Sequence, residues 1–250
     1  MKKILFVIPH PDDEIVGSCI LIRKLLREKK EISIVFLTNG VISPNQNWFW
    51  KKNKYQDFIK IRKDEMLQSL ELLNIKEYYY QNIPTRNLKY NISESHNLIC
   101  KIIKKNKIDT IFCPTFEGGH QDHDIANFIC SRLKGLCNLY EFAEYNFFQR
   151  KINSNTFFDS NNNEETILLN HSQQKFKNKC LRIYESEKKN LDYINVDKES
   201  FRPMLNHNYS KPPHHGTLFY RRYSFFSWHP KVDSSSPLET TNIILRSNIY

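Results

Sequence analysis

The chain has 250 residues, of which 40% are hydrophobic and 26% charged, a composition typical of a globular protein long enough to bury a substantial core. Its formal net charge of +10 would attract an acidic ligand, such as a phosphorylated or nucleotide-linked sugar, a uronate or a nucleic acid. The lysines are scattered, however, as on a solvated surface, and we favour that interpretation. No RNA- or DNA-binding signature is present, so we expect no nucleic-acid partner.

The cysteine and hydropathy patterns point to a reduced, cytoplasmic chain. None of the six cysteines forms a CxxC pair, and most sit in apolar surroundings, where a free cysteine behaves as a small hydrophobe. The apolar run after Lys2 and Lys3 is too short for a signal peptide. No segment approaches the roughly 20 apolar residues that span a bilayer, so we expect no membrane span.

Strand and helix patterns alternate along the first 190 residues. The strand pattern marks residues 4–8, 31–37, 77–81, 109–114 and 138–148. Helical periodicity marks residues 15–26, 55–73, 93–105, a segment that includes 125–133, and 173–191. This alternation predicts a Rossmann-like α/β domain over residues 1–190, with a mostly parallel sheet and helices on both faces. Residues 191–250 are less regular and are expected to be a C-terminal extension packed on the same domain.

A first polar cluster lies where the first strand ends and the first helix begins. Residues 8–14 read Ile-Pro-His-Pro-Asp-Asp-Glu, which places His10, Asp12, Asp13 and Glu14 at this junction. Ligands bind at the carboxyl ends of strands in open α/β sheets. A plainer interpretation is that the three acids cap the helix and suit its dipole.

A second cluster follows the strand at 109–114 in the same way. His120 and His123 stand three residues apart, after Gly118 and Gly119. Parallel strands end at the same edge of a sheet, so the two clusters should meet. His10, Asp13 and His123 would then hold one ion with a position left for water, the ligand set of a hydrolytic zinc site.

The two clusters resemble the motifs of the PIG-L/LmbE-like zinc-dependent N-deacetylases. The first motif is residues 9–14, and the second is Gly-Gly-His-Gln-Asp-His at 118–123. The resemblance extends over about residues 1–190 and includes residues 62–65 and 184–187. Relatives often carry proline where this chain has Gln121, a position that is not a ligand.

The resemblance implies a role for each motif residue. His10, Asp13 and His123 would be ligands of Zn²⁺, or of another divalent metal such as Fe²⁺. Asp12 would be the general base, and His120 would stabilise the oxyanion or protonate the leaving amine. Asp122 would orient His120.

Three further residues are candidates for substrate binding. Arg62 is expected to contact substrate, as similar residues do in relatives, although a surface arginine is an equal alternative. Glu144 and Tyr145 lie in the later part of the predicted strand at 138–148 and are expected to line the pocket.

The implied substrate is an N-acylated amino sugar or glycoconjugate, with an anionic conjugate as one option. Two alternatives stay open: an amidohydrolase that acts on a non-sugar acylated amine, and a catalytically silent carbohydrate- or nucleotide-binding domain. The sequence does not indicate the number of subunits.

Overall fold

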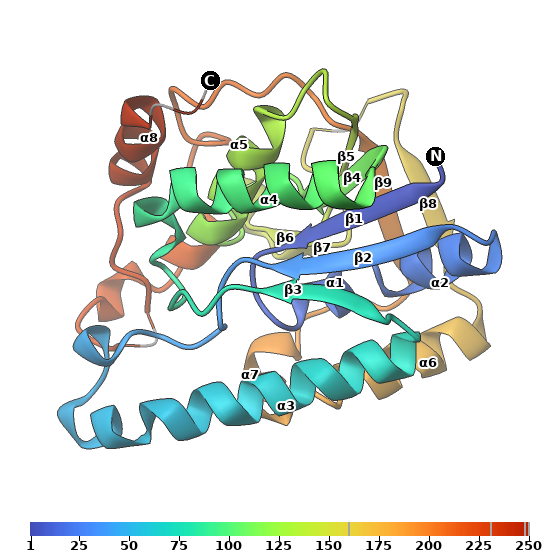
Figure 1. Ribbon diagram of the computed structural model, residues 1–250. Helices are drawn as coiled ribbons and strands as arrows, with labels where there is room; N and C mark the ends of the chain where they lie inside the picture. Colours follow the sequence, from blue (N-terminus) through green and yellow to red (C-terminus); the bar gives the residue numbers. More distant parts are fainter. Residues whose placement is uncertain (160, 231, 248, 250) are drawn as a thin grey trace.

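The computed structural model describes residues 1–159, 161–230, 232–247 and 249, and is organised around a mixed sheet with strand order β3-β2-β1-β4-β5-β9-β8 (Figure 1). Five strands run parallel: β1 (Lys3–Ile8), β2 (Glu31–Phe36), β3 (Glu77–Tyr80), β4 (Thr110–Pro114) and β5 (Asn138–Phe142). The expected mostly parallel α/β fold is therefore confirmed.

The sheet continues beyond β5 with two strands that the sequence patterns do not predict. β9 (Lys198–Pro203) runs antiparallel to β5, and β8 (Glu165–Leu168) pairs antiparallel with β9. A separate two-stranded sheet joins β6 (Tyr145–Asn146) to β7 (Asn153–Ser154). The chain after residue 191 thus supplies a strand of the main sheet.

Helices cover both faces of the sheet (Figure 1). The α-helices are α1 (Asp13–Val16), α2 (Cys19–Arg27), α3 (Tyr55–Leu73), α4 (Ile92–Asn106), α5 (Gln121–Ser131), α6 (His171–Leu181), α7 (Lys188–Leu191) and α8 (Pro237–Arg246). Helices α4 and α5 lie on one face, and α8 packs beside α5. Helices α2, α3 and α6 lie on the other face. In the described part of the chain, no helix is both long and apolar enough to cross a lipid bilayer.

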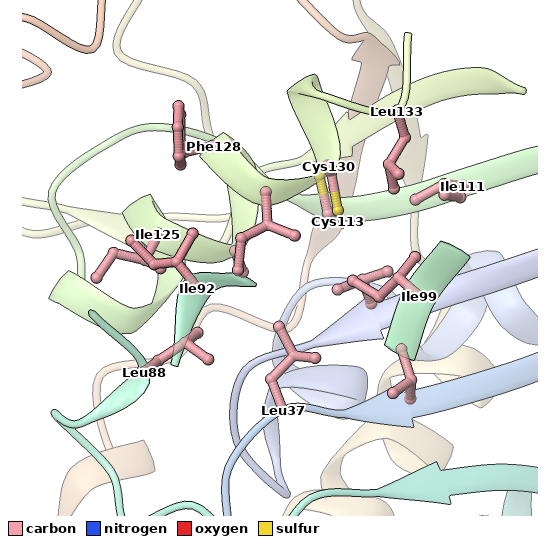
Figure 2. Packing of buried hydrophobic residues seen from close by; sticks show 14 of the residues in the cluster. Leu37, Leu88, Ile92, Ile99, Ile111, Cys113, Ile125, Phe128, Cys130 and Leu133 are labelled. Atoms are coloured by element: carbon pink, nitrogen blue, oxygen red, sulfur yellow. The ribbon is translucent and has the colours of Figure 1, made fainter. Parts of the chain in front are cut away.

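The central strand β1 is buried on both faces, which is why its sequence is a continuous apolar run. Leu5 and Val7 join the core beneath α4 and α5, where Ile99 and Ile125 are also buried (Figure 2). The alternate residues, such as Phe6, join the second core beneath α2 and α3. Because side chains pack against both faces of β1, the turn that follows this strand has a fixed position.

The predicted helix over 15–26 is broken into α1 and α2. The break occurs at Gly17, where a Cβ atom would lie 2.4 Å from the ring of Phe142. At this break the buried amine of Lys177 donates to Val16 O at 2.8 Å, at the end of α1. Buried Glu199 accepts from the first backbone amides of α2, including Ile20 N at 2.9 Å. Lys177 and Glu199 pair at 2.8 Å, so α6 and β9 together stabilise the break.

Candidate metal centre and active site

Two turns at the carboxyl edge of the sheet bring the polar clusters together. His10 follows β1, and Asp13 is the first residue of α1. Residues 115–120 connect β4 to α5, so His123 lies in the first turn of α5. β1 and β4 are adjacent and parallel, and their ends therefore carry both turns to one spot.

Two nitrogen atoms and one oxygen atom from these turns face one point. His10 Nδ1 lies 3.0 Å from Asp13 Oδ2, and His123 Nε2 lies 3.1 Å from the same oxygen. The two histidine nitrogens are 3.2 Å apart. Donor atoms of a tetrahedral zinc ion are about 3.4 Å apart for bonds of roughly 2.1 Å, so this triangle has the spacing of ligands to one ion.

Each histidine of this triangle has a carboxylate at its other ring nitrogen. Asp122 Oδ2 lies 3.0 Å from His10 Nε2, and Glu144 Oε2 lies 2.9 Å from His123 Nδ1. Metal-binding histidines have such carboxylate partners, which fix the ring and its tautomer. Two overlapping groups of three residues also have potential donor atoms within 4.8 Å of one another. One is His10, His120 and His123, and the other is Asp13, His123 and Glu144. The donor set therefore fits a divalent cation such as zinc.

The local charges also favour a cation at this point. Burial alone would lower the pKa of His10, but Asp13 and Asp122 outweigh it and raise this pKa to about 9. Burial would raise the pKa of Asp13, yet His123 and His10 lower it below its ordinary range. Burial and Asp13 raise the pKa of Glu144 to about 8, against the opposing effect of His123. Neighbouring positive charge thus stabilises the charged form of Asp13, whereas the negative charge of Glu144 is only partly compensated.

Asp12 sits beside this triangle in a strained turn. Its φ of 126° lies in a region that L-residues rarely adopt, and such strain persists where the surroundings enforce it. Its amide donates to Glu14 Oε2 at 3.0 Å, and Glu14 in turn accepts from the hydroxyls of Ser69 and Tyr184. Burial raises the pKa of Asp12 well above its ordinary value, against the charge of Arg62.

Arg62 reaches this turn from α3 and is buried there, so it is not a surface arginine. Its Nη1 donates to Asp12 Oδ2 at 3.1 Å and to Pro11 O at 3.0 Å. Its Nη2 pairs with Glu187. The motifs at 62–65 and 184–187 therefore meet at Arg62, which in turn contacts the Asp12 carboxylate.

His120 is the N-cap of α5, and its Nδ1 accepts from the amide of Asp122 at 3.1 Å. The Asp122 carboxylate lies 3.7 Å from this nitrogen but only 3.0 Å from His10 Nε2. It also accepts from the amide of Arg86 at 2.6 Å. Asp122 therefore orients His10 more directly than His120, which differs from the expected arrangement. Burial and the neighbouring charge of His10 hold the pKa of His120 well below its ordinary value.

A cavity of about 380 Å³ opens over these residues. Its lining includes His10, Asp12, Asp13, His120, Arg62 and Tyr145. Glu144 is not part of the lining and lies buried behind His123, so the structure gives it a supporting place instead of the expected contact with substrate.

The sequence patterns miss the C-terminal part of the cavity wall. That part consists of Tyr193, Phe219, Tyr220, Arg222, Tyr223, Val232 and Asp233. An aromatic run between residues 219 and 228 is the only signal in the sequence, and it does not show which rings face the cavity. Gln121 connects this wall to α5, since its buried amide donates to Asp233 Oδ2 at 2.6 Å.

The fold and site define an α/β protein with a buried histidine–aspartate donor set at the carboxyl edge of a parallel sheet. The PIG-L family, described as GlcNAc-PI de-N-acetylase, matches residues 5–133, which is more than half of the chain. This chain belongs to the PIG-L family.

Several solved structures share the fold. Teicoplanin deacetylase Orf2, in its zinc-inhibited form, aligns with a TM-score of 0.63 and 10% identity over 83% of this chain and 99% of its own. The N,N'-diacetylchitobiose deacetylase of Pyrococcus horikoshii gives 0.58 and 20% identity, over 81% and 84%. GalB of Pseudomonas putida, a 4-carboxy-2-hydroxymuconate hydratase, gives 0.51 and 13% identity, over 83% and 99%. Since a hydratase shares this fold, the fold alone does not decide the reaction.

Proposed function

We propose that this protein is a metal-dependent N-deacylase that removes an acyl group, in the first instance acetyl, from an amino sugar or sugar conjugate. The observation that carries the proposal is the triangle of His10 Nδ1, Asp13 Oδ2 and His123 Nε2, with sides of 3.0–3.2 Å, beside the cavity. Membership of the PIG-L family and the two deacetylase structures support the choice of an amide substrate.

In this proposal, His10, Asp13 and His123 would hold one divalent ion, for which zinc fits the donor set. When bound, such an ion polarises the amide carbonyl and makes its water more acidic. The carboxylates of Asp122 and Glu144 keep the two imidazoles in place.

Asp12 and His120 would move the protons. Both line the cavity on the side of the ligand triangle. Asp12 accepts a proton from the attacking water, while Arg62 holds its carboxylate in position. Because the pKa of His120 is lowered, its ring starts neutral; it would take over the proton that Asp12 accepts and pass it to the departing amine, which is a poor leaving group without a proton.

The experiment compares acetate release by the wild type, Asp12→Asn and His10→Ala on a panel of acylated amines, with bound zinc measured in parallel. The panel contains N-acetylglucosamine, its 1-phosphate, a nucleotide-linked form and N-acetyl amino acids. Loss of a general base costs about 100-fold or more in rate. Asp12→Asn should therefore keep its zinc and lose activity, while His10→Ala loses both.

Asp57→Asn, the same change at an exposed position of α3, is the matched control and should retain activity. Acetate release from the N-acetyl amino acids alone would show that the substrate is a non-sugar acylated amine. Normal turnover by Asp12→Asn would remove the role given to that carboxylate. A wild type that binds sugars without releasing acetate would be a silent binding domain.

A further inference from the structure

The C-terminal wall of the cavity carries an arginine, Arg222, that the ligand and base roles do not use. This residue lines the same cavity of about 380 Å³ as His10 and Asp12. It lies outside residues 5–133, the part of the chain that matches the family. The family match therefore assigns no role to Arg222.

Aromatic rings surround the Arg222 guanidinium. Its central carbon lies 3.6 Å from the centre of the Phe219 ring, 4.6 Å from that of Tyr223 and 5.8 Å from that of Tyr193. Stacking on aromatic faces fixes the plane of an arginine while leaving its N–H edge available. These rings thus hold the group at the cavity without neutralising its charge.

The hydrogen bonds of Arg222 are incomplete. Nη1 donates to Phe219 O at 2.9 Å, whereas Nε is buried and has no acceptor. Among the described residues, no carboxylate forms an ion pair with this guanidinium. Among the described residues Nη2 has no acceptor either, and it is not one of the buried unpaired atoms, so it is the N–H group that a ligand oxygen in the cavity can reach.

The acids in the cavity wall are already engaged elsewhere. Arg62 binds both Asp12 and Glu187. Asp233 accepts from the side chain of Gln121 at 2.6 Å and from the amide of Ser235 at 2.9 Å. Asp13 faces the two candidate metal-binding histidines, as described above. Among the described residues, the positive charge of Arg222 is therefore not offset by a carboxylate of the cavity wall.

We propose that Arg222 is a specificity-determining residue that selects substrates bearing an oxyanion, a carboxylate or a phosphate, on the sugar or its conjugated group. The inference rests on the proposed deacylase function and narrows its substrate class. The N–H groups at the Nη2 end of the guanidinium can donate charge-assisted hydrogen bonds to a carboxylate or phosphate oxygen.

The test measures kcat/KM for three amino sugars with the zinc-loaded protein. N-acetylglucosamine is neutral, its 1-phosphate carries a phosphate, and N-acetylmuramic acid carries a carboxylate. The wild type should prefer at least one anionic sugar over the neutral one by about 10-fold or more, as expected for hydrogen bonds to a charged group. Whichever anionic sugar is preferred identifies the type of oxyanion.

Arg222→Gln should reduce this anionic-to-neutral ratio by about 10- to 100-fold, and Arg222→Lys should retain part of it, since lysine keeps the charge but not the planar guanidinium that stacks on the rings. The matched control is Arg23→Gln, because the guanidinium of Arg23 stacks 3.7 Å from the ring centre of Phe176 and does not line this cavity. The control should keep the wild-type ratio. An equal loss on neutral and anionic sugars in Arg222→Gln would show a purely structural role and overturn the proposal, as would a wild-type ratio near one.

A binding measurement separates this inference from the deacylase proposal. Calorimetry with metal-free protein and N-acetylglucosamine 1-phosphate removes any contribution of a metal ion to phosphate binding. The wild type should bind about 10-fold or more tightly than Arg222→Gln. If no sugar is deacylated but the wild type still binds the phosphate more tightly than Arg222→Gln, the proposed deacylation is wrong and the anion site stands. If sugars are deacylated and the two proteins bind equally, the reaction stands and the role of Arg222 is refuted.

Discussion

Replacement of Lys177 by methionine tests how the chain stabilises the helix break beside the site. The Lys177 amine is fully buried, with Val16 O and Glu199 Oε1 both at 2.8 Å. Methionine fills much of the same space but provides no positive charge. Glu199 would then keep only its backbone donors on α2, while the carbonyl of Val16 would lose its donor from Lys177.

The magnitude follows from the burial of both partners. Removal of one member of a buried ion pair costs about 3–5 kcal/mol because the remaining charge is left without compensation. In a chain of 250 residues, each kcal/mol lowers Tm by roughly 2–4 °C, so we expect Lys177→Met to lower Tm by roughly 6–20 °C.

Urea denaturation and thermal unfolding of metal-free protein measure this loss. The double variant Lys177→Met/Glu199→Gln removes both charges and keeps an oxygen for the α2 amides, so it should recover a large part of the lost stability. Lys175→Met, the same change at an exposed position of α6, should stay within about 0.5 kcal/mol of the wild type. A loss below about 1 kcal/mol in Lys177→Met, or a double variant no more stable than the single one, would show that this ion pair does not stabilise the helix break.

Two further predictions concern the C-terminal wall and the response to acid. Gln121 is the first residue of α5, where proline is well tolerated, so Gln121→Pro should keep the helix and zinc binding but loosen Asp233. Limited proteolysis should show faster cleavage near residue 233, and unchanged cleavage would contradict this. Burial would raise the pKa of Glu141, but His207 and Arg202 outweigh it and lower this pKa. The folded state therefore gains stability from Glu141 above the carboxyl's ordinary pKa of 4.5 and loses it as the pH falls through the lowered value. In urea titrations from pH 6 to 3, the difference in free energy of unfolding between the wild type and Glu141→Gln should shrink toward acid. A constant difference would show that the Glu141 carboxylate does not contribute to the pH dependence of stability.

The parallel part of the sheet could be predicted from the sequence because its strands are buried on both faces. The run at 4–8 became β1, and the periodic segment at 55–73 coincides with α3. In both cases a single local pattern, continuous or helical, reports burial directly. No competing polar residue interrupts the run that forms β1.

β9 was missed because charged residues replace the apolar pattern at buried positions. Glu199 is buried against Lys177, and Arg202 is buried against Glu141 at 2.7 Å. Each pair joins residues that are far apart in the sequence, so no local window shows that the charges are compensated. The break between α1 and α2 has a similar cause, since Gly17 meets Phe142 from β5.

The candidate ligands could be predicted because two short motifs follow adjacent parallel strands. The supporting contacts could not, because they depend on side-chain direction. Glu144 points behind His123 instead of into the cavity, and Asp122 reaches His10 more closely than His120. Arg222 belongs to a segment without regular periodicity, and only the folded chain shows that it faces the cavity.

Calorimetric titration of the metal-free protein with Zn²⁺ measures whether His10, Asp13 and His123 bind one metal ion. We predict one ion per chain for the wild type and for the control His96→Ala, whose histidine lies on α4 and outside the cavity lining. His10→Ala and His123→Ala should each weaken binding by more than about 100-fold, since loss of a partner that only orients a ligand already costs about 10- to 100-fold. Wild-type protein that takes up no zinc, or His123→Ala protein that binds it as tightly as the wild type, would contradict the account.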